Sequence, residues 1–181
     1  MFKKTTLLVT TTSLMILTGC QNKTISKPSL IDYKKINTDF KQIQEKYNKE
    51  APDYQISEIN LETERVDKNR TAVYEIEGFK DKDAMDVTLK ANNLAKVRHK
   101  QDQPDMNEQA INFDKIKLPI DKAIEKAQTY ANVKSNPEEL SLKVNKKGTL
   151  TYEVKFEEKH QEIEVSINAE TGDKISIDYD D

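Results

Sequence analysis

Residues 71–97 read TAVYEIEGFKDKDAMDVTLKANNLAKV, and residues 149–175 read TLTYEVKFEEKHQEIEVSINAETGDKI. The two stretches align without a gap, so that Tyr74 recurs as Tyr152, Ala91 as Ala169 and Lys96 as Lys174. Self-similarity at a fixed spacing indicates that one supersecondary unit was duplicated. The fold question therefore reduces to one unit of roughly 60 to 80 residues.

A helical pattern precedes each stretch. Apolar residues recur there at intervals of three and four, which places them on one helical face. The first face comprises Ile36, Phe40, Ile43 and Tyr47, and the second comprises Ile120, Ile124, Ala127 and Ala131. Asn37 or Thr38 is the expected cap of the first helix, and Pro119 suits the start of the second.

Alternating apolar and polar residues predict strands after each helix. In the second unit they cover 140–144, 150–156, 163–169 and 175–179, separated by turn residues such as Gly148 and Gly172. In the first unit they cover 59–61, 72–76, 85–91 and 95–97. The expected fold class is α+β: two tandem repeats, each one α-helix packed on a small antiparallel β-sheet.

The N-terminus reads as a processing segment that is excluded from fold reasoning. Lys3 and Lys4 precede an apolar stretch that is too short to span a bilayer. The stretch ends in Leu17-Thr18-Gly19-Cys20, which resembles a bacterial lipobox. We expect cleavage behind Gly19 and a diacylglyceryl group on Cys20, the only cysteine in the chain. The alternative is a free thiol near an ordinary secretory cleavage site.

These boundaries divide the chain into a signal peptide (1–19), a lipid-anchored tether (20–35), a first domain (36–100), a linker (101–117) and a second domain (118–181). The tether contains the apolar residues Leu30, Ile31 and Tyr33, so it could either extend freely or dock on the first domain. Ile111 and Phe113 leave open whether the linker is mobile or braces the second domain or the interface.

Composition narrows the class of protein. Charged residues make up 34% of the chain and apolar residues 35%, which favours two small cores over one large core. The formal net charge is −3, without a basic block, so nucleic acid is an improbable partner. A single cysteine also excludes a disulfide within the chain.

The second unit resembles the PepSY family, small modules found in propeptides of metalloproteases and in envelope lipoproteins. Residues 118–127 are similar to the opening helix of that family, 152–154 to its central strand and 165–175 to its closing hairpin. The first unit departs from this pattern because Leu94 stands where Gly172 stands in the second. Leucine is strained at positive φ, so we expect Asn93 or Asn92 to adopt the left-handed conformation instead.

Catalytic and cofactor chemistry finds little support. The chain contains neither a phosphate-binding glycine motif nor a glycine elbow around a serine. His99 and His160 lack the spacing of a zinc site. The acidic groups Glu157-Glu158, Glu162 with Glu164, and 178–181 lack the ligand spacing of a calcium loop. We therefore expect no catalytic residue, no metal and no cofactor.

The favoured function is a non-catalytic binding module on the extracytoplasmic face of the cell membrane, in a Gram-positive bacterium. The resemblance implies an envelope protein partner, and the module would restrain an envelope peptidase. An open sheet edge could accept an extended segment by strand addition. The alternative is a scaffold lipoprotein that positions another envelope component without inhibition.

The anchor is testable by replacing Cys20 with Ala. Two acyl chains give stable membrane attachment, at about 0.8 kcal/mol for each buried CH₂ group. Cell fractionation should therefore find the variant released from membranes and the parent chain retained until detergent is added. Equal, detergent-dependent retention of both chains would contradict lipid anchoring through Cys20.

Overall fold

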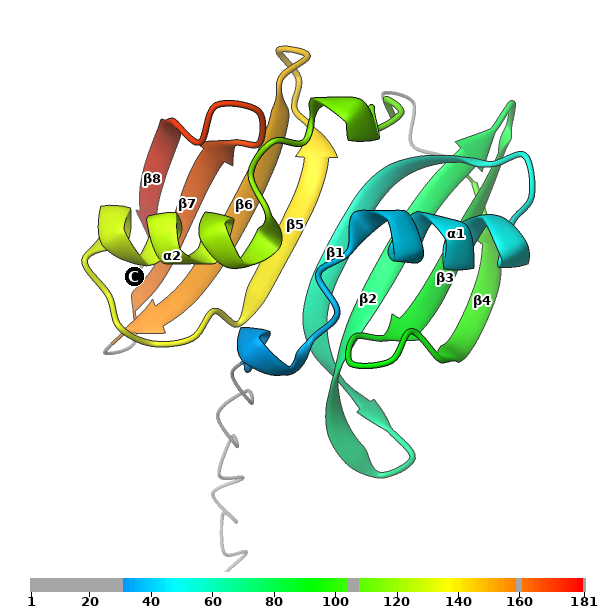
Figure 1. Cartoon of the computed structure of the whole chain (residues 1–181), viewed down its shortest axis with the longest axis horizontal. Helices are drawn as coiled ribbons and strands as arrows, with labels where there is room; N and C mark the ends of the chain where they lie inside the picture. The colour runs from blue at the N-terminus through cyan, green and yellow to red at the C-terminus, as the bar shows by residue number, and fades with distance from the viewer. Residues whose placement is uncertain (1–30, 104–107, 159–160, 181) are drawn as a thin grey trace, which may run out of the picture.

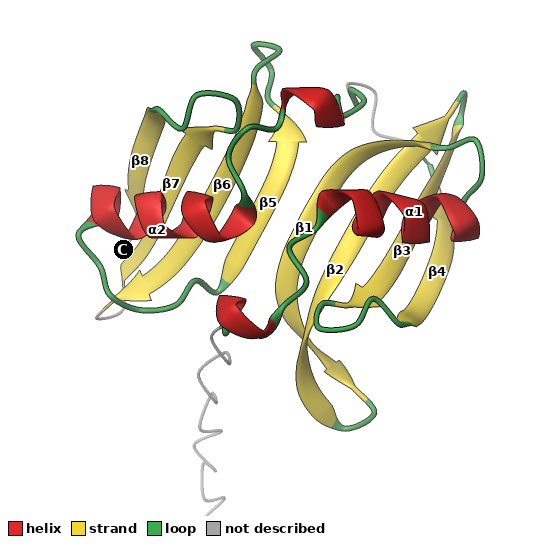
Figure 2. Cartoon of the chain, viewed as in Figure 1, coloured by secondary structure: helices red, strands yellow, loops and turns green. Residues whose placement is uncertain are grey.

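The computed structural model describes residues 31–103, 108–158 and 161–180. In this part of the chain, eight strands form one continuous antiparallel sheet in the order β4-β3-β2-β1-β5-β6-β7-β8. The two α-helices, α1 (Phe40–Glu50) and α2 (Ile120–Ala131), lie on the same face of this sheet (Figures 1 and 2). The strands are β1 (Gln55–Val66), β2 (Asn69–Lys80), β3 (Asp83–Lys90), β4 (Lys96–Asp102), β5 (Glu139–Val144), β6 (Leu150–Glu158), β7 (Gln161–Asn168) and β8 (Lys174–Asp180).

The prediction of two tandem repeats, each with its own small sheet, is wrong. Strands β1 and β5 pair in antiparallel fashion and fuse all eight strands into one sheet. At this seam Ile59 lies opposite Leu142 and Leu61 opposite Leu140, and all four side chains are buried. An unpaired edge strand exposes backbone N–H and C=O groups, and pairing two such edges satisfies both of them. The buried apolar residues accordingly form a single core cluster.

Helix α1 begins later than the apolar spacing predicts. Asp39 is its N-cap, and its side chain accepts hydrogen bonds from the backbone N–H groups of Lys41 and Gln42. Asn37, an expected cap, instead accepts a hydrogen bond from the backbone N–H of Asp39. Ile36 therefore lies outside the helix, while Ile43 and Tyr47 still form its buried face.

Two tyrosines at matching positions hold the chain that leads into each helix. Tyr74 on β2 donates its hydroxyl hydrogen bond to the carbonyl oxygen of Asn37 at 2.5 Å. Tyr152 on β6 donates in the same way to the carbonyl oxygen of Leu118 at 2.8 Å. Both side chains are fully buried, and burial raises the pKa of each phenol. The sheet therefore fixes where each helix starts.

Gly78 on β2 is required by the close approach of α1. A Cβ atom at this position would lie 2.3 Å from the hydroxyl oxygen of Tyr47 and 2.7 Å from the carbonyl oxygen of Gln55. The Tyr47 hydroxyl uses this space to donate a hydrogen bond to the carbonyl oxygen of Met85 at 3.0 Å. Any larger residue at position 78 would force the Tyr47 ring or the Gln55 carbonyl to shift.

The left-handed residue between β3 and β4 is Leu94, with φ of 55°, so the prediction of Asn92 or Asn93 is wrong. Gly172 occupies the matching position between β7 and β8, with φ of 74°. Both turns close with a 2.8 Å backbone hydrogen bond, from Leu94 to Lys90 and from Gly172 to Asn168. Leu94 is only 3% exposed and joins the core. Burial of a leucine side chain contributes roughly 1.5–3 kcal/mol, which offsets a left-handed penalty of about 1–2 kcal/mol.

The connecting segments contact the core. Ile31 is buried and donates its backbone N–H to the carbonyl oxygen of Pro137. Ile111 is buried and donates its backbone N–H to the carbonyl oxygen of Ile56 on β1. The Phe113 ring, in the short 3₁₀ helix Phe113–Lys115, packs edge-on against the ring of Phe40 on α1, with 6.3 Å between centroids. Where it is described, the segment between β4 and α2 thus contacts the first half through Ile111 and Phe113, and the second half through the backbone N–H groups of Lys117 and Leu118, which donate to Ala169.

The strain at Leu94 can be tested against its partner turn. Leu94→Gly should lower the free energy of unfolding by about 1–3 kcal/mol, because the lost burial exceeds the relieved strain. Gly172→Ala should lower it by about 1 kcal/mol, because alanine gains no core contact to offset the positive φ. Urea denaturation measures both values. An increase in stability for Leu94→Gly would show that backbone strain dominates at this turn.

Candidate protein-binding face

The sheet has one face that neither α-helix covers (Figure 1). Side chains alternate along a strand, so the residues between the core positions point to this face. On β1, for example, Glu58, Asn60 and Glu62 alternate with the buried Ile59 and Leu61. We call this surface the helix-free face. Its ionisable residues include Glu58, Glu62, Glu64, Glu75, Glu77, Asp86, Arg98, Lys100, Glu139, Lys143, Glu153, Lys155 and Glu164.

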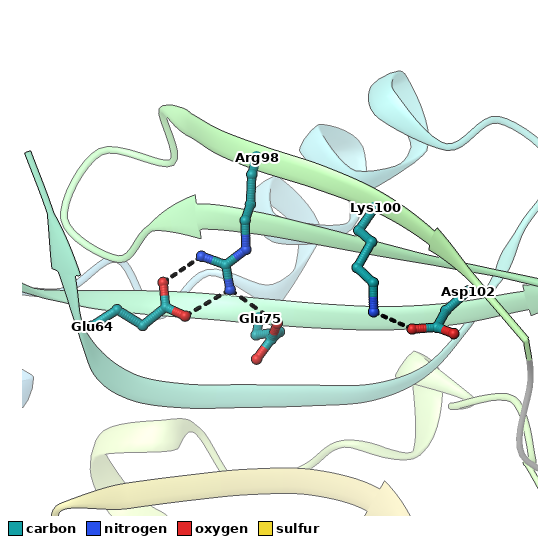
Figure 3. Close-up of polar contacts among 5 residues, drawn as sticks. All are labelled: Glu64, Glu75, Arg98, Lys100 and Asp102. Atoms are coloured by element: carbon teal, nitrogen blue, oxygen red, sulfur yellow. Dashed lines mark hydrogen bonds and ion pairs between the residues drawn. The ribbon is translucent and has the colours of Figure 1, made fainter.

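Arg98 clamps three strands together on the helix-free face. Its guanidinium donates two 2.6 Å hydrogen bonds to the carboxylate of Glu64 on β1 and one of 3.2 Å to Glu75 on β2 (Figure 3). These contacts raise the pKa of Arg98 above its ordinary value. Lys100 on the same strand pairs with Asp102. The edge strand β4 is thereby tied to the middle of the sheet.

The carboxylates of Glu62, Glu64 and Glu75 lie close enough together to hold a metal ion in principle. Glu64 and Glu75 already accept hydrogen bonds from Arg98, so the guanidinium supplies the positive charge that these two carboxylates need. The geometry therefore supports a structural ion-pair cluster here. Sequence reasoning missed this cluster, because only the strand register brings Arg98 to Glu64.

A cleft opens on the helix-free face at the seam between β1 and β5. Its lining is mainly charged and includes Lys143. The ammonium of Lys143 lies 2.8 Å from a carboxylate oxygen of Glu153 and 3.6 Å from one of Glu58. The other lining residues are Ser57, Glu77, Glu108, Gln109, Val144, Asn145, Lys146 and Lys147. We call this pocket the seam cleft.

Several acidic side chains line the seam cleft. Burial, together with repulsion from Glu58 and Asp86, raises the pKa of Glu77 to about 7. Burial also raises the pKa of Glu58, despite its contact with Lys143. Burial lowers the pKa of Lys143, but its contacts with Glu153 and Glu58 outweigh this and leave it raised. The cleft therefore favours an added positive charge beside Glu77.

The structure brings few of the sequence candidates into this site. Cys20, Gly19 and His160 lie outside the described residues. His99 is exposed on the edge strand β4. Ser57 lines the seam cleft, and its hydroxyl donates a hydrogen bond to the carboxylate of Glu108 at 3.2 Å. Glu162 and Glu164 lie on β7 of the same sheet face.

The described part of the chain contains no helix with the length and apolar character that a bilayer crossing requires.

The residues of the seam cleft carried one sequence signal that could have identified them. Charged residues alternate with core residues on both β1 and β5, and pairing these strands would have placed Glu58 opposite Lys143. Nothing in the spacing of the sequence specifies that pairing.

The fold and the charged face define an α+β protein with a helix-covered core and an open polar surface. Residues 117–178 match the family described as peptidase propeptide and YPEB domain, so this segment is a PepSY domain. It contains α2 and nearly all of β5 to β8. The resemblance of the second unit to PepSY is confirmed.

The whole arrangement is similar to a solved structure. A crystal structure of a protein provisionally described as a lipoprotein, from Clostridium difficile 630, superposes with a TM-score of 0.67 at 17% identity. The alignment covers 80% of this chain and 95% of that one. The likeness establishes a shared fold over both halves of the sheet. No curated protein gives a significant match.

The raised pKa of Glu77 predicts a pH dependence of stability. Between the ordinary pKa of a glutamate and about 7, the folded state holds a proton that the unfolded state releases, so stability falls as pH rises through this window. Because Glu77 is partly exposed, we expect Glu77→Gln to recover only about 1 kcal/mol at pH 8 and little at pH 4.

Urea denaturation across this pH range measures the effect. Glu45→Gln, on the exposed surface of α1, is the control for loss of one carboxylate. A Glu77→Gln chain whose stability profile runs parallel to that of the parent would contradict a strained carboxylate in the cleft.

Proposed function

We propose that the chain is a non-catalytic PepSY binding protein that is lipid-anchored on the outside of the cell and restrains an envelope peptidase through the seam cleft. The observation that carries this proposal is the cleft itself, which opens beside β5 of the PepSY domain and is lined by mutually repelling carboxylates. The description of the family supports a peptidase as the partner. The lipobox at Cys20 supports the anchor.

The chemistry of the cleft indicates what the partner presents. A lysine or arginine side chain placed beside Glu77 would replace carboxylate repulsion with attraction. Lys146 and Lys147 line the same cleft and suit an acidic residue of the partner. Alternating charges of this kind favour one orientation of the bound segment and exclude mismatched ones.

The backbone pairing of β1 with β5 preorganises the cleft before a partner binds. Its lining residues Glu58 and Lys143 lie on neighbouring strands whose backbones pair from Glu58 with Lys143 to Leu61 with Leu140. A site on paired strands holds its side chains in place before the partner binds, which reduces the entropy cost of binding. The role that we assign to the cleft residues is recognition.

The test is capture of partners from an envelope extract by residues 21–181, followed by assays of the captured peptidases. The parent chain should bind and slow a peptidase, whereas Glu77→Lys should bind much less because it places a positive charge where the partner needs a negative one. Glu45→Lys, on α1, makes the same charge change on the helix-covered side and should bind as the parent does.

Three results would overturn parts of the proposal. Captured peptidases that keep full activity would contradict restraint. Capture of another envelope component without a peptidase would favour the alternative, a scaffold lipoprotein. Equal capture by Glu77→Lys and Glu45→Lys would place the binding surface away from the seam cleft.

A further inference from the structure

The edge strand β8 (Lys174–Asp180) has no neighbouring strand on its outer side in the described part of the chain. It also carries Ile175 and Tyr179, which are 43% and 54% exposed and are the large apolar side chains most open to solvent among the described residues. An exposed edge with apolar side chains is a template for pairing with another chain. The question is which chain this edge accepts.

The opposite edge, β4, shows what a protected edge looks like in this fold. At the positions of Ser176, Asp178 and Tyr179, strand β4 carries Arg98, Lys100 and Gln101. Positively charged side chains on an edge strand oppose the addition of a further strand. The two edges share their geometry, including a bulge at the start of each strand. Of the two edges, only β8 therefore exposes large apolar side chains.

We propose that β8 pairs antiparallel with β8 of a second copy of this chain, about a two-fold axis at Ile177. In this register Tyr179 lies opposite the bulge that contains Ile175 of the second copy, so the exposed apolar side chains lie next to each other. Ser176 faces Asp178 of the second copy, and no carboxylate opposes another. The bulge leaves Ser176 to Asp180 as the regular part of the strand, which contains the centre of the pairing.

The neighbouring registers are poorer. A shift that centres the axis on Asp178 places two like charges directly opposite, which is destabilising in a strand pair. A shift that centres it on Ser176 places Tyr179 opposite Asp173 in the turn before β8 and leaves its ring uncovered. The strand is therefore self-complementary in one register.

Pairing of β8 with β4 of another copy is less favourable, although β4 is the more basic edge. Arg98 is already bound to Glu64 and Glu75, and Lys100 is bound to Asp102, so these charges are neutralised within one chain. That arrangement is also head-to-tail, so it would give a larger ring or an open filament rather than a closed pair. A two-fold pair of β8 strands closes after two copies.

The test is a disulfide cross-link in the full chain. Ser176→Cys with Asp178→Cys places each thiol opposite its partner in the proposed dimer, at the short Cα separations that a disulfide needs. Cys20 is the only native cysteine, so the parent chain reports any background. Cells expressing the double variant should give a dimer band under a mild oxidant.

Two further chains make the result decisive. Lys100→Cys with Asp102→Cys puts the same spacing on β4 and should give no dimer. Adding Ile175→Lys and Tyr179→Lys to the β8 cysteine pair should abolish the dimer band. Both positions are exposed, so the thermal midpoint should stay that of the parent.

Several outcomes would overturn the proposal. No cross-link from the β8 pair would show that β8 is free or is covered by something else, such as the N-terminal segment. An equal yield from the β4 pair would indicate random collision. A ladder of larger products would indicate head-to-tail assembly, and a dimer that survives the two lysines would place the interface elsewhere.

Discussion

The backbone pairing of β1 with β5 is the constraint on which the rest of the structure depends. Four residue pairs, from Glu58 with Lys143 to Leu61 with Leu140, turn two four-stranded arrays into one sheet. Their apolar members close a single core on the helix-covered side. Their charged members build the seam cleft on the other side. One set of backbone hydrogen bonds thus determines both the core and the candidate binding site.

The two halves share their local structure, but they use different residues at the turn that needs a left-handed conformation. The buried tyrosines Tyr74 and Tyr152 hold the chain before each helix by the same hydrogen bond. The turns after β3 and β7 need one left-handed residue, which glycine provides without strain at Gly172. At Leu94 the strain is accepted because the side chain enters the core. Packing energy overrides a backbone preference of similar size.

The asymmetry between the halves also extends to their surfaces. Strand β4 carries Arg98 and Lys100, whose charges are paired with carboxylates of the same chain. Strand β8 instead exposes Ile175 and Tyr179. The PepSY domain therefore contains both the unprotected edge and one wall of the seam cleft. The first half contributes the other wall and the Arg98 clamp. Each half supplies what the other lacks for recognition.

The sequence alone determined the local elements. Alternation of apolar residues located the four strands after α2, and apolar residues at intervals of three and four located the helical faces of Ile43 and Ile124. The second unit was identified as similar to PepSY. These features follow from periodicity, which a strand or helix needs wherever it lies in the fold. The predicted start of α1 was wrong because Asp39, rather than Asn37, is the N-cap.

Only the tertiary structure decided what joins these elements. The single sheet, the positive φ of Leu94, the Arg98 clamp and the seam cleft each depend on which strand edges meet and which side chains are buried together. Backbone hydrogen bonds are alike for every sequence, so the sequence of an edge strand does not specify which strand it pairs with. Its partner is set by the packing of the side chains on both faces of the completed sheet.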